Sequence, residues 1–258
     1  MPASNPAEPF SFSLILGDIL VTKSFQRMSW FQLDSNSVAA RVRASGRPAE
    51  LSCLGTSVQR GIVGFTLLSI AGFAPWAIAG RWLYRNIGEG GLYAVCALVF
   101  VLLSGPLLHR LIIGPGSFAR FYKLFGLTFA VYSILWVAGW MMVRGHPGSV
   151  VGLLAGTTAM GWTLACAFDA KARTPKVIAA LFVLNSIGYF AGGWIEGAIM
   201  GIRQISLFGA GLGRPAQAML AKLLWGVCYG VGFGAGLGFA FHFCQEKTRE
   251  VLRALELR

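Results

Sequence analysis

Charged side chains are scarce in this chain of 258 residues, at 12%, which is about half their share in an average soluble domain. Hydrophobic residues reach 55% and aromatic residues 13%, so an intrinsically disordered chain is excluded. The uncharged apolar runs are too long and too many for a soluble enzyme domain. The composition therefore indicates a polytopic membrane protein.

Motifs of catalysis and metal binding are missing too. The five cysteines are scattered, which excludes a disulfide-rich secreted domain. The three histidines, His109, His146 and His242, lie on different segments, and no H-x-x-H or C-x-x-C pair is present. No Walker motif, no paired carboxylates within an apolar run and no serine with a neighbouring histidine base are visible. We therefore predict no metal, no cofactor and no enzymatic activity.

Six runs of about 20 residues are long and apolar enough to cross a bilayer core as helices. They cover residues 61–80, 90–108, 124–143, 147–168, 177–200 and 223–244. A transmembrane barrel would show segments of roughly 10 residues with alternating polarity, and these runs do not alternate. Helices also pair their own backbone groups, as lipid demands. The prediction is an all-α polytopic bundle of six transmembrane helices.

Lys and Arg residues are distributed unevenly between the two sides of this predicted bundle. Sixteen of the 22 lie before the first run, in the second and fourth connections, and in the tail. By the positive-inside rule that side is cytoplasmic, so we expect both termini in the cytoplasm and the chain in the cell inner membrane. The formal charge of +12 then predicts contact with anionic lipid headgroups on the cytoplasmic face, and no nucleic-acid partner.

The chain divides into three parts. Residues 1–60 are a cytoplasmic segment with an expected interfacial helix over 10–33, although residues 10–14 alternate as a strand would. Glu8 and Asp18 argue against a signal peptide. Residues 61–244 are the transmembrane domain and 245–258 a cytoplasmic tail. In the tail, Val251, Leu252 and Leu255 are expected to contact a partner or the membrane, unless the helix end is simply solvated.

Glycine, with 34 residues, exceeds its average share of about 7%. Many glycines recur every four residues in the last two runs, which places them on one helix face. The glycines expected at helix contacts are Gly188, Gly192, Gly193, Gly197, Gly226, Gly230, Gly234 and Gly238. Such a face, as in a glycine zipper, lets another backbone approach closely. Two interpretations stay open: packing within the chain, and a seam for self-association or a pore-lining helix.

Glu196 is the only acidic residue inside an apolar run. It shares a helix face with Asn185, and Arg203, Arg214 and Lys222 lie toward the same end of the predicted bundle. Charges inside a membrane are costly and are usually paired or functional. We therefore consider an intramembrane polar site of Glu196, Asn185, Arg203 and Lys222. Its role is open between structural pairing or exposure and the handling of a proton or cation.

Proline and tryptophan add two further expectations. Pro106 cannot donate a backbone hydrogen bond, which predicts a kink near Leu102 in the second run. Seven tryptophans lie mostly toward the ends of runs, as interfacial anchors do. They are Trp76, Trp82, Trp136, Trp140, Trp162, Trp194 and Trp225.

Three classes of function remain. The first is a non-enzymatic membrane protein that passes a small solute or ion, alone or as a homo-oligomer, as a channel- or transporter-like bundle. The glycine-rich runs, Glu196 and the kinked second run favour it. The second is an accessory or scaffold subunit of a larger membrane complex, favoured by the shortage of polar groups inside the runs. The third, an intramembrane enzyme, has no catalytic constellation behind it.

Overall fold

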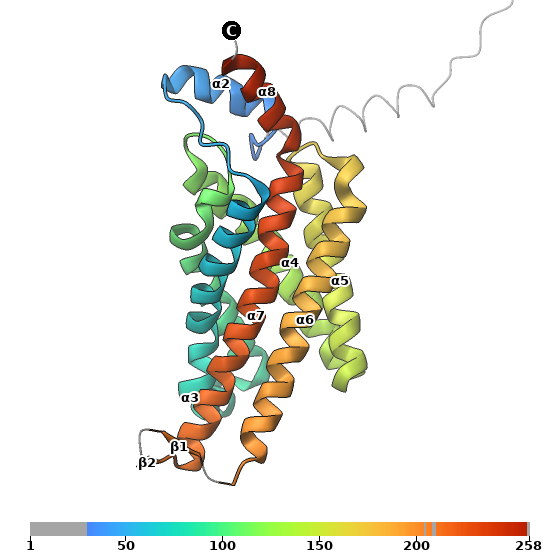
Figure 1. Cartoon of the computed structure of the whole chain (residues 1–258). Helices are drawn as coiled ribbons and strands as arrows, with labels where there is room; N and C mark the ends of the chain where they lie inside the picture. The colour runs from blue at the N-terminus through green and yellow to red at the C-terminus, as the bar shows by residue number, and fades with distance from the viewer. Residues whose placement is uncertain (1–29, 204, 208–209, 257–258) are drawn as a thin grey trace, which may run out of the picture.

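The structure is a computed structural model that describes residues 30–203, 205–207 and 210–256. Its helices are α2 (Ser35–Ser45), α3 (Leu54–Leu108), α4 (Ser117–Val143), α5 (Gly145–Ala167), α6 (Thr174–Gly201), α7 (Arg214–Cys244) and α8 (Glu246–Glu256), with 3₁₀ turns η1 (His109–Leu111) and η2 (Lys171–Arg173). Two short strands, β1 (Ser206–Leu207) and β2 (Ala210–Gly211), pair antiparallel. The long helices lie side by side, with α2 and α8 at one end and the strand pair at the other (Figure 1).

The long helices have the length and composition of membrane-spanning segments. Among the residues that the structure describes, five stretches are long and apolar enough to cross a membrane: Leu54–Leu111, Ser117–Val143, Gly145–Ala167, Lys171–Gly201 and Arg214–Cys244. The last four contain most or all of the last four predicted runs. The chain is therefore an all-α helical bundle with the character of an integral membrane protein, as predicted from its composition.

The first two predicted runs both lie within α3, so the structure has five such helices where the sequence predicts six. α3 contains one non-helical residue, Gly88, with φ 71° and ψ −178°, a backbone conformation open to glycine. The two arms of α3 on either side of Gly88 fold back on each other. The Phe65 and Phe100 ring centroids, one from each arm, are only 5.6 Å apart. The sequence predicts a connection over residues 81–89 between two helices, whereas in the structure Gly88 is the one non-helical residue of that segment.

Pro106 lies within α3 at the place where a kink was predicted. Its missing N–H leaves the Leu102 carbonyl without its helical donor. The Tyr122 hydroxyl of α4 donates to that carbonyl instead. Gly105 leaves room for the Tyr122 ring, since an added Cβ would lie 2.0 Å from it. The proline thus creates an acceptor that joins α3 to α4, and Gly88 remains the non-helical residue of α3.

α7 approaches two neighbouring helices at backbone distance through glycine. A Cβ added at Gly234 would lie 2.4 Å from the Gly61 carbonyl oxygen, and one added at Gly238 would lie 2.4 Å from the Ser57 carbonyl oxygen. On the other side of α7, a Cβ at Gly232 would lie 2.3 Å from the Leu184 carbonyl oxygen of α6. No larger residue fits these contacts without moving a backbone.

The other glycines expected at helix contacts differ among themselves. A Cβ added at Gly188 would clash with the Cys228 carbonyl. One added at Gly192 would clash with the Trp225 ring, and one added at Gly230 would clash with Thr66. At Gly226 and Gly193 the nearest atoms, from Phe73 and Trp225, are 3.3 Å and 3.7 Å away. Gly197 has nothing within 4 Å among the described residues. On α6, the pair Gly188 and Gly192 therefore makes close contacts, whereas the row of Gly193, Gly197 and Gly201 makes none closer than 3.7 Å among the described residues.

α2 and α8 cover the end of the bundle from which α3 starts. Asp34 caps the N-terminus of α2, and its carboxylate accepts from the Ser37 amide at 2.9 Å. Leu252 of α8 and Val38 of α2 are buried in one small cluster, against which the tail residues Val251 and Leu255 pack. The tail residues expected to contact a partner or the membrane, or to be solvated, thus pack on α2 of their own chain. The expected helix over 10–33 lies largely outside the described residues.

We predict that Gly234→Leu destabilises the fold strongly, because the new side chain would meet the backbone of α3. The cost should reach at least the ~1–3 kcal/mol of an overpacked core. Gly197→Leu is the matched control, since it adds the same side chain to a helix position with open space beside it. Thermal unfolding of both variants in one detergent gives the comparison, and equal midpoints would contradict the close approach.

Candidate functional site

A cavity of about 260 Å³ lies inside the bundle, in the half nearer to Gly88 and to the start of α7. Residues from both arms of α3 and from α4, α6 and α7 line it. They are Gly72, Phe73, Trp76, Leu92, Tyr93, Cys96, Ala97, Phe100, Phe129, Tyr132, Ser133, Trp136, Val137, Trp140, Tyr189, Trp225 and Tyr229. The walls are therefore mostly aromatic, and no lining side chain is acidic, basic or a histidine.

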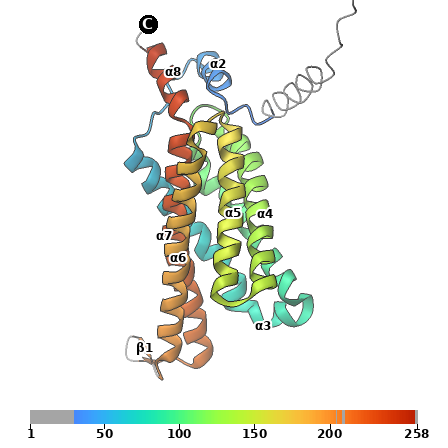
Figure 2. The ribbon, with the colours of Figure 1, turned by 90° about the vertical axis from the view of Figure 1, so that its right-hand side faces the viewer.

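The helices leave this space because they are packed differently along their length. Toward the end with α2 and α8, phenylalanines fill the interior: Phe121 stacks on Phe125 at 5.1 Å and on Phe241 of α7 at 5.8 Å. Toward the other end, α4 pairs closely with α5, where a Cβ at Gly152 would lie 2.6 Å from the Trp136 carbonyl oxygen. In Figure 2, α4 and α5 run as one pair beside α6 and α7. The cavity lies in the part of the bundle where α4 packs closely against α5.

Three buried hydroxyl and amide groups form a chain of hydrogen bonds at one wall. The Asn185 amide donates to the Tyr132 hydroxyl at 3.0 Å, and the Tyr132 and Tyr229 hydroxyl oxygens are 3.1 Å apart. Beside them, the Ser149 and Tyr189 hydroxyl oxygens are also 3.1 Å apart. These contacts hold three tyrosine rings of the cavity wall in fixed positions, because buried polar groups are costly when unpaired.

Several polar atoms around the cavity have no partner within the part of the chain that the structure describes. They are the indole N–H groups of Trp136 and Trp225 and the Asn185 side-chain oxygen. Each belongs to a residue that lines the cavity or contacts a lining tyrosine. A polar group left unpaired in an apolar interior costs free energy. The cavity therefore combines aromatic walls with nearby unused hydrogen-bonding capacity.

Charged groups stand at the ends of the cavity and not within it. Arg144 forms an ion pair with Glu89 at 3.6 Å, and its guanidinium lies 4.5 Å from the Trp140 ring centroid. The Tyr93 hydroxyl is 3.4 Å from the same Glu89 carboxylate. At another wall, the Lys222 ammonium lies 4.6 Å from the Trp76 ring centroid. The interior thus suits an uncharged molecule, since no charged side chain among the lining residues would compensate a bare ion.

The predicted intramembrane polar site is not assembled as one cluster. Asn185 is fully buried in the hydroxyl chain described above, whereas Glu196 is half-buried and Arg203 is exposed. Among the described residues, Glu196 makes no ion pair within 4.0 Å. Lys222 donates to the Trp76 carbonyl at 3.4 Å, while Arg214 donates to the Met200 carbonyl at 3.0 Å.

Four tryptophans expected to be interfacial anchors line the cavity instead: Trp76, Trp136, Trp140 and Trp225. The other three predicted anchors, Trp82, Trp162 and Trp194, are exposed, Trp194 by 75%. The position of a tryptophan near the end of a run does not distinguish the two groups, because it does not show on which helix face the side chain lies. The tyrosines Tyr93, Tyr132, Tyr189 and Tyr229 were not singled out from the sequence either. Within the described residues, no three His, Cys, Asp or Glu side chains gather as metal ligands would.

Comparisons of the chain with family models, with curated proteins and with solved structures gave no match. The function is therefore inferred from the geometry of the chain itself.

We predict that Tyr132→Phe destabilises the protein by about 1–3 kcal/mol, because it leaves the Asn185 amide and the Tyr229 hydroxyl buried without their partner. Tyr84→Phe, at an exposed residue, is the control for loss of a hydroxyl alone. Unfolding midpoints in detergent measure both changes. If both variants unfold together with the wild type, the hydroxyl chain does not fix the cavity wall.

Proposed function

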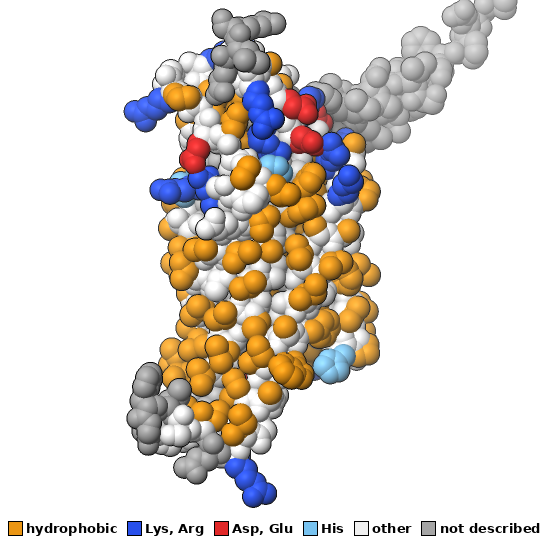
Figure 3. Space-filling model, viewed as in Figure 1, with side chains coloured by type: hydrophobic (Ala, Val, Ile, Leu, Met, Phe, Trp, Pro, Cys, Tyr) orange, Lys and Arg blue, Asp and Glu red, His pale blue; other side chains and the backbone are white. Residues whose placement is uncertain are grey.

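We propose that the protein is a multi-pass protein of the cell inner membrane, with six crossings and both termini in the cytoplasm. The two arms of α3 supply the first two crossings, because the chain folds back at Gly88. The charge distribution supports the orientation: in Figure 3, Lys and Arg side chains gather at the end with α2 and α8, next to a broad apolar band. Positive charge of this kind marks the cytoplasmic side.

Within this frame, we propose that the protein binds and passes a small neutral solute as a transporter-like bundle, without catalysing a reaction. The observation that carries the proposal is the cavity of about 260 Å³ with aromatic walls and no charged lining residue. Ligand sites are typically apolar with a few polar groups that fix orientation. The solute we favour has an aromatic or otherwise apolar body and one hydrogen-bonding group. An ion is the less favoured cargo.

The alternative function is that of an accessory or scaffold subunit. One observation favours it: the exposed face of α6 around Gly197 and Gly201 has nothing within 4 Å of either glycine among the described residues. A flat face of small residues is where another membrane helix packs well. Gentle extraction from the native membrane separates the two proposals, since fixed additional subunits would support the accessory role.

We predict that Ala97→Phe abolishes ligand binding, because residue 97 lines the cavity and a phenyl ring would occupy much of it. Ala94→Phe adds the same ring to an exposed position one turn away on α3 and should bind normally. The probe is a brominated benzyl alcohol, whose heavy atom quenches the tryptophans of the cavity wall. The wild type in neutral vesicles should show a saturable component of quenching that Ala97→Phe lacks.

Two outcomes would count against the solute-binding proposal. One is quenching that rises without saturation in the wild type and equally in both variants, as simple partition into lipid produces. The other is a potassium or chloride flux through vesicles with the wild type that Ala97→Phe leaves unchanged, since ions would then use another route.

A further inference from the structure

A second pocket, of about 310 Å³, lies at the opposite end of the bundle, where α3 begins and α7 meets α8. Unlike the aromatic cavity, it is lined largely by polar and charged side chains. Arg249 and Arg253 come from α8, His242 from the last turn of α7, and Ser52 and Cys53 from the residues just before α3. The pocket thus joins three segments that are far apart in the sequence.

Arg249 is only 6% exposed, yet its guanidinium has no hydrogen-bond or ion-pair partner among the described residues. Arg120 is equally buried and shows the contrast, because it donates to five backbone carbonyls, those of Pro115 and Gly114 at 2.8 and 3.1 Å among them. Burial lowers the pKa of Arg249, but arginine stays protonated in proteins. The Arg249 nitrogens are not among the fully buried atoms without a partner, so the guanidinium reaches the space of the pocket, where an anion could pair with it.

Two carboxylates, those of Glu246 and Glu250, line the pocket and favour the charged form of Arg249 without forming an ion pair with it. Glu246 itself forms an ion pair with Arg173. Glu250 also lines the pocket but is exposed and lies beyond 4.0 Å of either arginine. The only other titratable groups that line the pocket are the His242 imidazole and the Cys53 thiol. Two guanidinium groups therefore face the space without a carboxylate bound to them.

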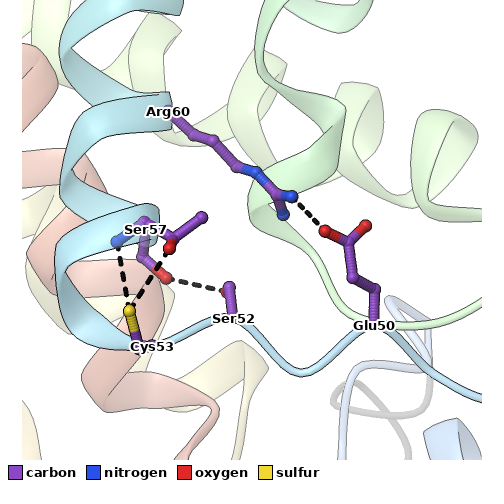
Figure 4. Close-up of polar contacts among 6 residues, drawn as sticks. Glu50, Ser52, Cys53, Ser57 and Arg60 are labelled. Carbon is purple, nitrogen blue, oxygen red and sulfur yellow. Dashed lines mark hydrogen bonds and ion pairs between the residues drawn. The ribbon is translucent and has the colours of Figure 1, made fainter.

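The start of α3 adds a favourable dipole to the same space. Cys53 caps the helix, accepting from the Thr56 amide at 3.5 Å, and the Ser52 and Ser57 hydroxyl oxygens are 2.9 Å apart (Figure 4). The His242 ring nitrogen Nδ1 lies 3.3 Å from the Ser57 hydroxyl. Helix N-termini attract anions, since their first amides point outward and the dipole is positive there.

We propose that this pocket binds a phosphate group, with Arg249 as its principal ligand and Arg253, His242 and Ser52 as further donors. Guanidinium is the side chain best suited to phosphate, because its planar N–H groups match two phosphate oxygens. The phosphate can belong to an anionic phospholipid headgroup or be free in solution. The position favours the headgroup, since Leu54, exposed at the pocket, is the first residue of a membrane-spanning stretch.

The test measures the unfolding midpoint of the full chain in a neutral maltoside detergent. The additions are dioleoyl phosphatidylglycerol, inorganic phosphate, or potassium chloride at equal ionic strength. The wild type should be stabilised by a phosphate compound beyond the effect of chloride. Arg249→Gln should lose this rise, with binding weaker by roughly tenfold or more, as for a charge-assisted hydrogen bond. Arg47→Gln removes one exposed charge elsewhere at the same end and should keep the rise.

Without any phosphate compound, Arg249→Gln should unfold close to the wild type, because Arg249 makes no side-chain hydrogen bond or ion pair among the described residues that the substitution would break. Stabilisation by both phosphate compounds identifies free phosphate as sufficient, and stabilisation by the lipid alone identifies a headgroup site. The proposal is overturned if neither compound stabilises the wild type, if Arg249→Gln responds as the wild type does, or if Arg47→Gln loses the response too.

Alkylation of Cys53 provides a second measurement that needs no variant. Cys53 is exposed, and hydrogen bonds from Thr56 lower the pKa of its thiol, so it should react with a maleimide readily. A phosphate in the pocket would shield it. Slower labelling of Cys53 with phosphatidylglycerol or phosphate than with chloride is expected, and an unchanged rate would contradict occupancy of the pocket.

Discussion

The contact that the rest of the bundle depends on is the backbone-to-backbone approach of α7 to both α3 and α6. Gly234 meets Gly61 of α3, and Gly232 meets Leu184 of α6. Residues two apart on a helix point about 200° from each other, so two glycine rows give α7 two opposite flat faces. Lipid provides no hydrophobic drive between helices, so this close packing has to provide the attraction. α4 and α5 form a second close pair at Gly152, and the aromatic cavity is the space between the two groups.

Much of this arrangement could be predicted from the sequence because it depends on local patterns. Long uncharged runs predict helices, and glycines four apart predict flat faces. The same patterns mislead where the outcome depends on one backbone angle or on a neighbour. Gly88 alone separates two runs that were expected to be separate helices with a longer connection. Gly197 belongs to the glycine row by spacing and yet has open space beside it.

The cavity could not be predicted, because its walls come from helices that the sequence does not place next to each other. Tyr132 and Tyr229 are 97 residues apart, and their hydroxyl contact requires α4 and α7 to meet at one depth. A tryptophan near the end of a run is equally compatible with an interfacial anchor and a cavity wall. Trp194 and Trp225 illustrate both outcomes, since the first is exposed and the second lines the cavity.

A shortage of acidic residues explains how the arginines of this chain are bound. With 10 Asp and Glu against 22 Lys and Arg, most basic groups cannot have a carboxylate partner. The fold uses backbone carbonyls instead: Arg120 binds those of the connection before α4, and Arg214 binds those at the end of α6. Both places supply free carbonyls, since one is a non-helical connection and the other a helix end. Arg249 lies on α8 and faces the pocket instead. The phosphate proposed for that pocket would be an acceptor from outside the chain, so the basic composition and Arg249 point to the same site.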